Sequence, residues 1–276
     1  FGILGLHFPE AYGGEGADVV TTVLAGEALG EAGVDGGLTL AYGAHTFLCA
    51  DTIFSHGTEA QRQHYIPKLA RGEWIGCMGL SEPDAGSDVA SMSTTAVRDG
   101  EHYVLNGTKQ FITNGSFAKL FIVFAKIDKE LFTAFLVEKD FEGLVIGPEE
   151  KKMGIKGSST TQVILDNCKV PVENLLGEAG KGHKISFNVL NVGRFKLGAC
   201  VTGAAKQATL VGVKYANERK QFNQPISSFG AIQEKIADLT ADTFAAESLV
   251  YRLAGLLDTK LATIDREIDN YYVEYQ

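Results

Sequence analysis

The spacing of apolar residues predicts helices from Asp18 to about Gly72. In this segment apolar and small side chains recur every three or four residues, which is the pattern of helices with one buried face. A further helix is predicted to begin at Thr58, because Thr58 and Gln61 have the spacing of a capping box, in which two side chains satisfy free amides of the first turn. The N-terminal part of the chain is therefore predicted to be helical.

The pattern changes at about Ile75, where short runs rich in β-branched and aromatic residues begin. The runs at residues 102–105 and 109–113 are followed by Asn106-Gly107 and Asn114-Gly115. This dipeptide tolerates the positive φ of tight hairpins, so hairpin turns are predicted at both positions. The other runs lie at residues 120–124, 132–137, 144–146 and 161–165. Their spacing predicts an antiparallel sheet or a small barrel.

Helical spacing returns after Pro171, with long stretches from about His183 to Arg219 and from about Phe229 to Leu257. Helices, then strands, then helices cannot build alternating βαβ units, so an α+β fold is predicted. We expect an N-terminal helical domain at residues 1–75, a central antiparallel β domain at 76–178 and a C-terminal helical domain at 179–276. Both ends are expected to be truncated, because residue 1 is not Met and the helical pattern at Gln276 has no C-cap.

Composition excludes several classes of protein. The net charge of −9 argues against a nucleic-acid binder, which needs clustered Lys and Arg. No apolar run approaches the roughly 20 residues that span a bilayer, so a soluble protein is expected. The chain has 4 cysteines, which are far apart and form no CxxC pair, so a metal site is not expected and a reducing compartment is favoured.

Two segments are candidates for ligand binding. The loop Gly79–Asp88 is dense in small and hydroxyl residues, so its backbone could approach a planar polar ligand closely, although a polar interdomain turn has the same composition. Phe111 and Thr113 share one strand face by period two, and an aromatic ring beside a hydroxyl could stack on a ligand ring and bond its edge. An ordinary sheet face is the alternative for this pair.

Taken together, the two segments resemble the paired signature of the acyl-CoA dehydrogenase family. The resemblance extends along nearly the whole chain. The sequence of residues 229–235 is most similar to that of the very-long-chain branch. The other segments that carry it are Pro9–Gly14, Lys152–Lys156, Val170–Asn174 and Arg219–Phe222 before Pro225-Ile226. The resemblance implies FAD as the cofactor.

The resemblance assigns flavin contacts to both segments. Leu80 and Ser81 match positions at the pyrimidine side of the flavin, and Ser87 matches a position near its phosphates and the bound thioester. Phe111 stands where the family usually has Trp against the isoalloxazine ring, which keeps a π face but removes an N–H donor. Thr113 matches the hydroxyl that bonds flavin N5.

A second group of flavin contacts is implied across a subunit interface. Arg219, Gln221 and Phe222 match a trio that reaches the FAD of a neighbouring subunit, with Arg219 at the pyrophosphate and Phe222 near the adenine. A guanidinium suits phosphate because its planar fork binds two oxygens at once. Without the motif, Arg219 would be interpreted as a solvated charge at a helix end. A further position that is often Gln in the family is Gly230 here, so that contact is not expected.

Asn191 and Arg194 are the candidate substrate-binding residues of the C-terminal helices. With Asn188 they form a polar stripe at three-residue spacing, for which a solvated helix face is the default interpretation. The resemblance places Asn191 and Arg194 where the family contacts the pantetheine chain of the substrate, and Ser87 is the third substrate contact that it implies.

The implied activity is α,β-dehydrogenation of fatty acyl-CoA thioesters to trans-2-enoyl-CoA, a step of fatty acid β-oxidation, with electrons passed to an electron-transferring flavoprotein. A homodimer or homotetramer is implied, in the cytoplasm of a bacterium or the mitochondrial matrix of a eukaryote. The alternatives are an acyl-CoA oxidase that uses dioxygen and a non-catalytic assembly factor.

The catalytic base is expected outside this sequence. The family's usual glutamate would lie beyond Gln276, and the position used by the isovaleryl branch is Gly193 here. Glu82 is interpreted as a structural carboxylate. This chain is therefore expected to be inactive by itself.

Overall fold

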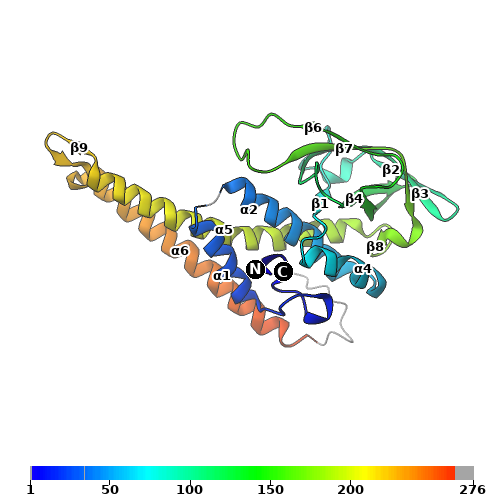
Figure 1. The fold of residues 1–276 in the computed structure, drawn as a ribbon, viewed down its shortest axis with the longest axis horizontal. Coiled ribbons are helices and arrows are strands. Elements are labelled where there is room, and N and C mark those ends of the chain that lie inside the picture. The colour runs from blue at the N-terminus through cyan, green and yellow to red at the C-terminus, as the bar shows by residue number, and fades with distance from the viewer. Residues whose placement is uncertain (1, 34, 265–276) are drawn as a thin grey trace. The chain divides into compact units, whose positions relative to one another are not determined.

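A computed structural model describes residues 2–33 and 35–264 of the chain. These residues form two compact units, one of residues 17–35 and 194–264 and the other of the remaining described residues. The predicted order of helices, strands and helices is confirmed (Figure 1). The predicted domain boundaries at residues 75 and 178 stay predictions.

The helices of the larger unit that precede its sheet are short. The capping box predicted at the start of α4 (Glu59–Ala70) is confirmed, since Thr58 Oγ1 accepts from the Gln61 amide and Gln61 Oε1 accepts from the Thr58 amide. The Gln61 side chain also donates to the carbonyl oxygens of Glu173 and Leu175, which ties α4 to the end of the sheet. The other short helices are η1 (Ile3–Gly5), η2 (Glu10–Tyr12), α2 (Gly36–Gly43), the π-helix η3 (Ala44–Ala50) and α3 (Asp51–His56).

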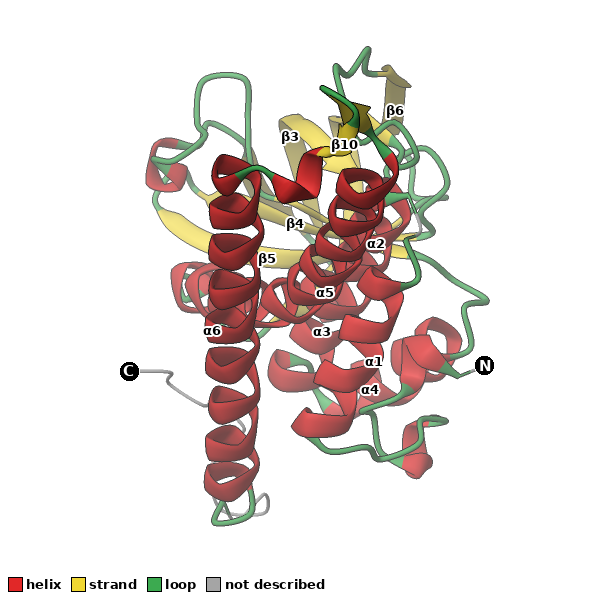
Figure 2. Cartoon of the chain, turned by 90° about the vertical axis from the view of Figure 1, so that its left-hand side faces the viewer, coloured by secondary structure: helices red, strands yellow, loops and turns green. Residues whose placement is uncertain are grey.

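The sheet of this unit has the strand order β6-β7-β3-β2-β4-β5-β8, with β1 added on β4, and its strands are yellow in Figure 2. The prediction of an antiparallel domain holds for most pairs, while β4 pairs in parallel with both β1 and β2. The strands are β1 (Gly76–Gly79), β2 (Thr95–Asp99), β3 (His102–Thr113), β4 (Leu120–Ile127), β5 (Leu131–Glu138), β6 (Leu144–Glu149), β7 (Thr160–Pro171) and β8 (Leu175–Leu176), with η4 (Val89–Ser91) before β2 and η5 (Val172–Asn174) before β8.

Strand β4 is apolar at nearly every position because it is buried on both faces. Leu120, Ile122 and Phe124 pack in one core cluster with helical residues such as Ile66. Phe121 and Val123 alternate with them and pack in a second cluster on the other face. A strand buried on both sides reads as a continuous apolar run, which is why its sequence shows no polar alternation.

The prediction of a hairpin turn at Asn106-Gly107 is wrong. Residues 102–113 form one continuous strand, and Gly107 lies inside it with a φ of 153°. Glycine is required there because a Cβ would lie 2.4 Å from Thr94 Oγ1. The turn between β2 and β3 instead lies at Gly100, and Asn114, with a φ of 68°, does follow the end of β3.

In the smaller unit, α1 (Val19–Glu31) packs with the second part of α5 (Gly182–Glu218) and with α6 (Gly230–Leu261). Helices α5 and α6 lie side by side, and the hairpin of β9 (Lys220–Gln221) and β10 (Gln224–Pro225) connects them before η6 (Ile226–Ser228) (Figure 1). The predicted helical stretches at 183–219 and 229–257 are thereby confirmed.

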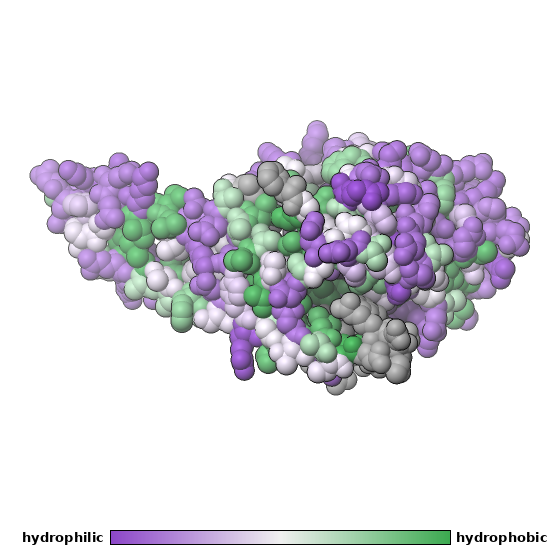
Figure 3. Space-filling view, turned by 60° about the horizontal axis from the view of Figure 1, so that its bottom comes forward, coloured by the Kyte–Doolittle hydropathy of each residue, from purple (hydrophilic) through white to green (hydrophobic). Residues whose placement is uncertain are grey.

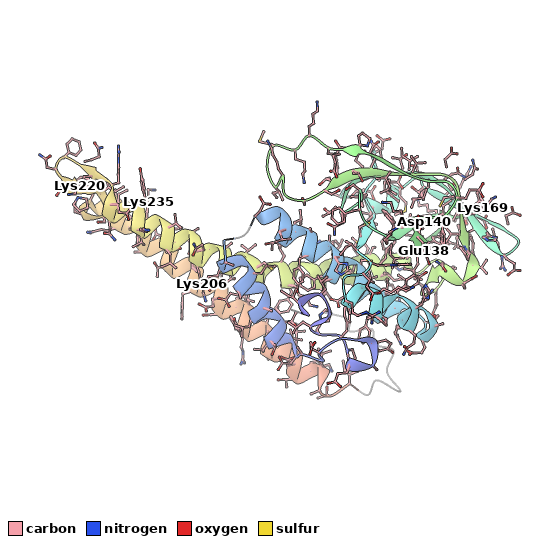
Figure 4. All side chains as sticks on the ribbon, in the orientation of Figure 1. Glu138, Asp140, Lys169, Lys206, Lys220 and Lys235 are labelled. Atoms are coloured by element: carbon pink, nitrogen blue, oxygen red, sulfur yellow. The ribbon has the colours of Figure 1, made fainter. Side chains whose placement is uncertain are left out.

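A buried carboxylate joins the three helices of the smaller unit. Glu27 of α1 forms an ion pair with Lys206 of α5, which is labelled in Figure 4, and accepts a hydrogen bond from Tyr251 of α6. Lys206 also pairs with Glu247 at 2.5 Å. Its bonds to Glu247 and Glu27 raise the pKa of Lys206, so this cation stays charged between the two carboxylates.

None of the helices within the described ranges has the length and apolar character to cross a bilayer. The same ranges contain no group of three or more His, Cys, Asp or Glu side chains that could hold a metal ion.

Candidate functional site

The loop that follows β1 is closed on itself by Glu82. A tight turn forms first, in which the Glu82 amide donates to the Ala85 carbonyl at 2.9 Å and the Ala85 amide donates back at 3.2 Å. The Glu82 carboxylate then accepts from the Ser93 amide at 2.6 Å, the Ser93 hydroxyl at 2.8 Å and the Thr94 amide at 3.1 Å. The start and end of the loop are therefore held together at one side chain.

Lys109 of β3 lies beneath this loop. Its Nζ donates to Glu82 Oε1 at 2.7 Å and to the Leu80 carbonyl at 3.4 Å, with side-chain exposures of 0% for Lys109 and 3% for Glu82. Burial alone would raise the pKa of Glu82, but hydrogen bonds from Lys109 and Thr94 outweigh it and lower that pKa to about 2. Burial lowers the pKa of Lys109 to about 8. Both groups are charged at neutral pH, which supports the interpretation of Glu82 as a structural carboxylate.

Strand β3 bulges where it passes the loop. Lys109 pairs with Val163 of β7 and the ladder resumes at Ile112 with Thr161, so three residue steps on β3 face two on β7. Phe111 lies in the bulge with a φ of 60° and a 65% exposed side chain. Ile112 is buried, and Thr113 is partly buried. Phe111 and Thr113 lie on either side of the buried Ile112, but the bulge interrupts the alternation of the strand between Lys109 and Ile112, so the shared face of Phe111 and Thr113 stays a prediction.

The structure brings the first predicted ligand segment next to the second. The Gln110 amide donates to the Ser81 carbonyl at 2.9 Å, so the loop residue Ser81 lies beside the residue that precedes Phe111. Leu80 is buried and Ser81 is partly buried. Ser87 is exposed farther along the loop, and a Cβ added at the adjacent Gly86 would meet no atom within 4 Å.

The hairpin of the smaller unit carries the second predicted group. Arg219 and Gln221 are exposed, and Phe222 is 87% exposed. Phe222 and Asn223 have φ values of 51° and 62°, the left-handed pair of a tight hairpin turn. Asparagine tolerates this conformation, whereas a bulky residue such as Phe is uncommon in it. The Phe222 ring makes an edge contact with Phe229, with centroids 6.2 Å apart.

Asn191 and Arg194 are both exposed on α5, and Asn188 is partly buried. The division between the two units falls between Gly193 and Arg194, so each residue is placed only within its own unit. At Gly193 a Cβ would lie 2.9 Å from Cδ2 of Leu48, so a side chain there would have to displace Leu48.

Lys109 and Gln110 are not among the site residues that the sequence predicts. A signal was present, because period-two spacing puts Lys109 on the buried face of β3 with Tyr103 and Leu105, where a cation requires a partner. The partner, Glu82, is 27 residues earlier in the chain, and only the packing of the loop on β3 brings the two together.

Comparisons with known proteins identify the same family, the acyl-CoA dehydrogenases, along nearly the whole chain. The N-terminal, middle and C-terminal domain profiles of acyl-CoA dehydrogenases match residues 1–73, 77–168 and 180–269. A probable acyl-CoA dehydrogenase of Bacillus subtilis is 48% identical over 96% of this chain, and this chain spans only 45% of that relative. A short-chain specific acyl-CoA dehydrogenase of Clostridium acetobutylicum is 42% identical over 96% of this chain and 71% of its own length.

Two further similarities are informative. The human mitochondrial very long-chain specific acyl-CoA dehydrogenase is 41% identical over 93% of this chain and 41% of its own length. A crystal structure of an acyl-CoA dehydrogenase complexed with FAD from Bacillus anthracis superposes with a TM-score of 0.92 at 50% identity, covering 96% of this chain and 45% of that one.

Proposed function

Because this chain belongs to the acyl-CoA dehydrogenase family, we propose that it is part of an enzyme that uses FAD to convert fatty acyl-CoA thioesters to trans-2-enoyl-CoA. The observation that carries the proposal is the hydrogen bond between Gln110 and Ser81, which places the loop and the bulged strand side by side. These are the two segments for which the family resemblance implies flavin contacts.

The residues present fit a flavin. The exposed Phe111 ring offers a π face for stacking, and the hydroxyls of Ser81 and Thr113 offer hydrogen bonds to the edge of a heteroaromatic ring. Open space at Gly86 lets the loop backbone approach the ligand closely. Bound FAD supplies the hydride acceptor, while this chain's residues bind it and orient its ring.

Substrate contacts are assigned to Ser87, Asn191 and Arg194, which are all exposed. An α-proton is weakly acidic, so the site must also supply a base, hydrogen-bond donors for the developing enolate oxygen and exclusion of water. The four hydrogen-bond donors and the ammonium group around Glu82 leave it unsuited to accept a proton. The family resemblance implies a glutamate beyond Gln276 for this role, and we propose that residue as the base.

A second subunit is part of this proposal. We assign Arg219, Gln221 and Phe222 to the FAD of a neighbouring copy, in a homodimer or homotetramer. Apolar surface supports association of copies: it gathers along the helices next to the hydrophilic hairpin tip in Figure 3. The exposed apolar side chains of α5 and α6 include Val201, Leu210, Val211, Phe244 and Leu249. The electron acceptor is proposed to be an electron-transferring flavoprotein.

The test of the function is anaerobic mixing of the FAD-loaded protein, extended beyond Gln276 to include the base, with butyryl-CoA or palmitoyl-CoA. Loss of flavin absorbance on mixing, with little oxygen uptake unless an electron-transferring flavoprotein is added, is the expected result. Rapid oxygen uptake without that acceptor would identify an oxidase. Absence of bound FAD and of bleaching would favour the non-catalytic alternative.

The two substrates in this test also address chain length. The short-chain and very long-chain relatives are nearly equally identical to this chain, at 42% and 41%, so identity does not choose between them. The rates at which butyryl-CoA and palmitoyl-CoA bleach the flavin show whether short or long acyl chains are preferred.

A further inference from the structure

The ion pair of Glu82 and Lys109 is buried almost completely, with 3% and 0% of the two side chains exposed. Removing two charges from water is expensive, and a buried pair is often no more stabilising than apolar residues of the same volume. Stability alone is therefore a weak reason to bury this pair. The contacts of the two side chains indicate a more specific role.

The pair joins three segments that are distant in the sequence. Lys109 reaches the start of the loop through the Leu80 carbonyl and Glu82. Glu82 reaches the end of the loop through Ser93 and Thr94. Lys109 itself belongs to β3, two residues before Phe111. One buried contact therefore fixes the loop to the strand at the point where the bulge begins.

The bulge depends on the same loop. The Gln110 amide donates to the Ser81 carbonyl, and the ladder to β7 resumes only at Ile112. The Gln110 side chain is held between Glu150 and Gln162, with Nε2 donating at 2.7 Å and Oε1 accepting at 2.6 Å. Gln110 is thus fixed on both sides, and Phe111 is left in the left-handed conformation with its ring exposed.

We propose that Glu82 and Lys109 are positioning residues for the flavin site, which hold the loop against the bulge so that Ser81 and Phe111 meet the flavin in one fixed geometry. The role assigned to the pair rests on the proposed function. Neither side chain touches the flavin in this proposal, and both act through the backbone of Leu80, Ser81 and Gln110. The charged pair supplies hydrogen bonds that are stronger than those between neutral groups.

The competing explanation is that the pair only stabilises the fold. The positioning role and a purely stabilising role can be distinguished with three variants: Glu82→Gln, Lys109→Met and the double variant. Each single variant leaves one buried charge without its partner and should lose stability. The double variant removes both charges, so its thermal stability should exceed that of either single variant. If the pair positions the loop, the double variant still lacks the charged contact and the site stays misaligned.

Two measurements report whether the loop of residues 79–94 keeps its position against the bulge of β3. Amide hydrogen exchange in the FAD-free protein should accelerate at residues 79–94 and at Gln110 in the double variant, while the rest of the sheet keeps its protection. The dissociation constant of FAD should rise by about tenfold or more, as expected when charge-assisted hydrogen bonds are lost. Tyr65→Phe is the matched control, since it removes the buried hydrogen bonds of Tyr65 to Glu138 and Asn174 away from the loop.

The control should lose stability while its FAD affinity and its exchange in the loop stay unchanged. A double variant that keeps the parent's exchange at Gln110 and the parent's FAD affinity would overturn the positioning role. If the parent protein bound no FAD, the proposed function would fail, and the exchange experiment would still decide whether the pair holds the loop to the bulge.

Discussion

At the scale of single residues, two exposed aromatic side chains occupy conformations that such residues rarely adopt. Phe111 and Phe222 have φ values of 60° and 51°, with 65% and 87% of their side chains exposed. The left-handed conformation costs roughly 1–2 kcal/mol for a residue with a Cβ. Because both rings are exposed, burial of apolar surface does not offset this conformational cost. The strain is therefore better explained by a ligand-binding role than by stability.

The substitution Phe111→Gly should therefore stabilise the FAD-free protein and weaken FAD binding. We expect a gain of about 1 kcal/mol from relief of the left-handed strain, and a weaker flavin complex because the stacking face is lost. Urea unfolding and FAD titration measure the two effects. Phe117→Gly is the control, because Phe117 is also exposed but has no positive φ, and it should lose stability. A stability loss in Phe111→Gly as large as in the control would contradict the strain argument.

Glu82 should make the protein sensitive to acid. Its pKa in the folded protein is about 2, below the ordinary value of 4.5, because the hydrogen bonds of Lys109 and Thr94 outweigh burial. The stability that Glu82 contributes is present above the ordinary pKa and is lost as the pH falls from about 4.5 through 2. Lys109 is protonated in both the folded and unfolded states in this pH range, so it does not contribute to the dependence of the free energy of unfolding on pH.

Urea unfolding across this pH range should show a shallower dependence of stability on pH in Glu82→Gln than in the parent. Other carboxylates titrate in both proteins, so the difference between the two curves isolates Glu82. Parallel curves would mean that Glu82 is not the acid-sensitive group.

At the scale of elements, α1 and α5 approach so closely that glycine is required between them. A Cβ at Gly203 would lie 1.9 Å from the Glu27 carbonyl oxygen, and a Cβ at Gly30 would lie 2.0 Å from the Cys200 carbonyl oxygen. The helices therefore pack backbone against backbone at these positions. The same close packing brings Glu27 within reach of Lys206.

Gly203→Ala should destabilise the protein by about 1–3 kcal/mol or more, because the added methyl group forces the two helices apart. Gly212→Ala on the same helix is the matched control: no atom lies within 4 Å of its Cβ position, and alanine is the better helix former by up to about 1 kcal/mol. Thermal unfolding of both variants checks this. Equal melting temperatures for the two variants would be inconsistent with the close approach of α1 and α5.

At the scale of the whole molecule, the proposed assembly depends on the hairpin between α5 and α6. Arg219→Ala should weaken FAD retention and dimerisation together, because one guanidinium would serve the cofactor of the neighbouring copy. Loss of a charge-assisted phosphate contact should cost about 1.5–3 kcal/mol. Sedimentation and FAD retention during gel filtration measure the two effects.

Lys220→Ala is the control for Arg219→Ala, since it removes an exposed positive charge from the same hairpin (Figure 4). It should leave both properties close to those of the parent. The cross-subunit assignment would have to be abandoned if Arg219→Ala dimerised normally and retained flavin as tightly as Lys220→Ala.

The sequence by itself determined the order of helices, strands and helices, the capping box at Thr58 and Gln61, and the family. These features depend on local periodicity, on side chains that bond within one turn, and on motifs of fixed spacing. Tertiary structure decided that residues 102–113 form one bulged strand. Asn106 pairs with Thr95 of β2 and Gly107 pairs with Leu165 of β7, so the neighbouring strands keep this dipeptide extended where an isolated Asn-Gly would form a turn. It also decided the pairing of Glu82 with Lys109, because the strand period can place Lys109 on a buried face but does not say which distant carboxylate its charge meets.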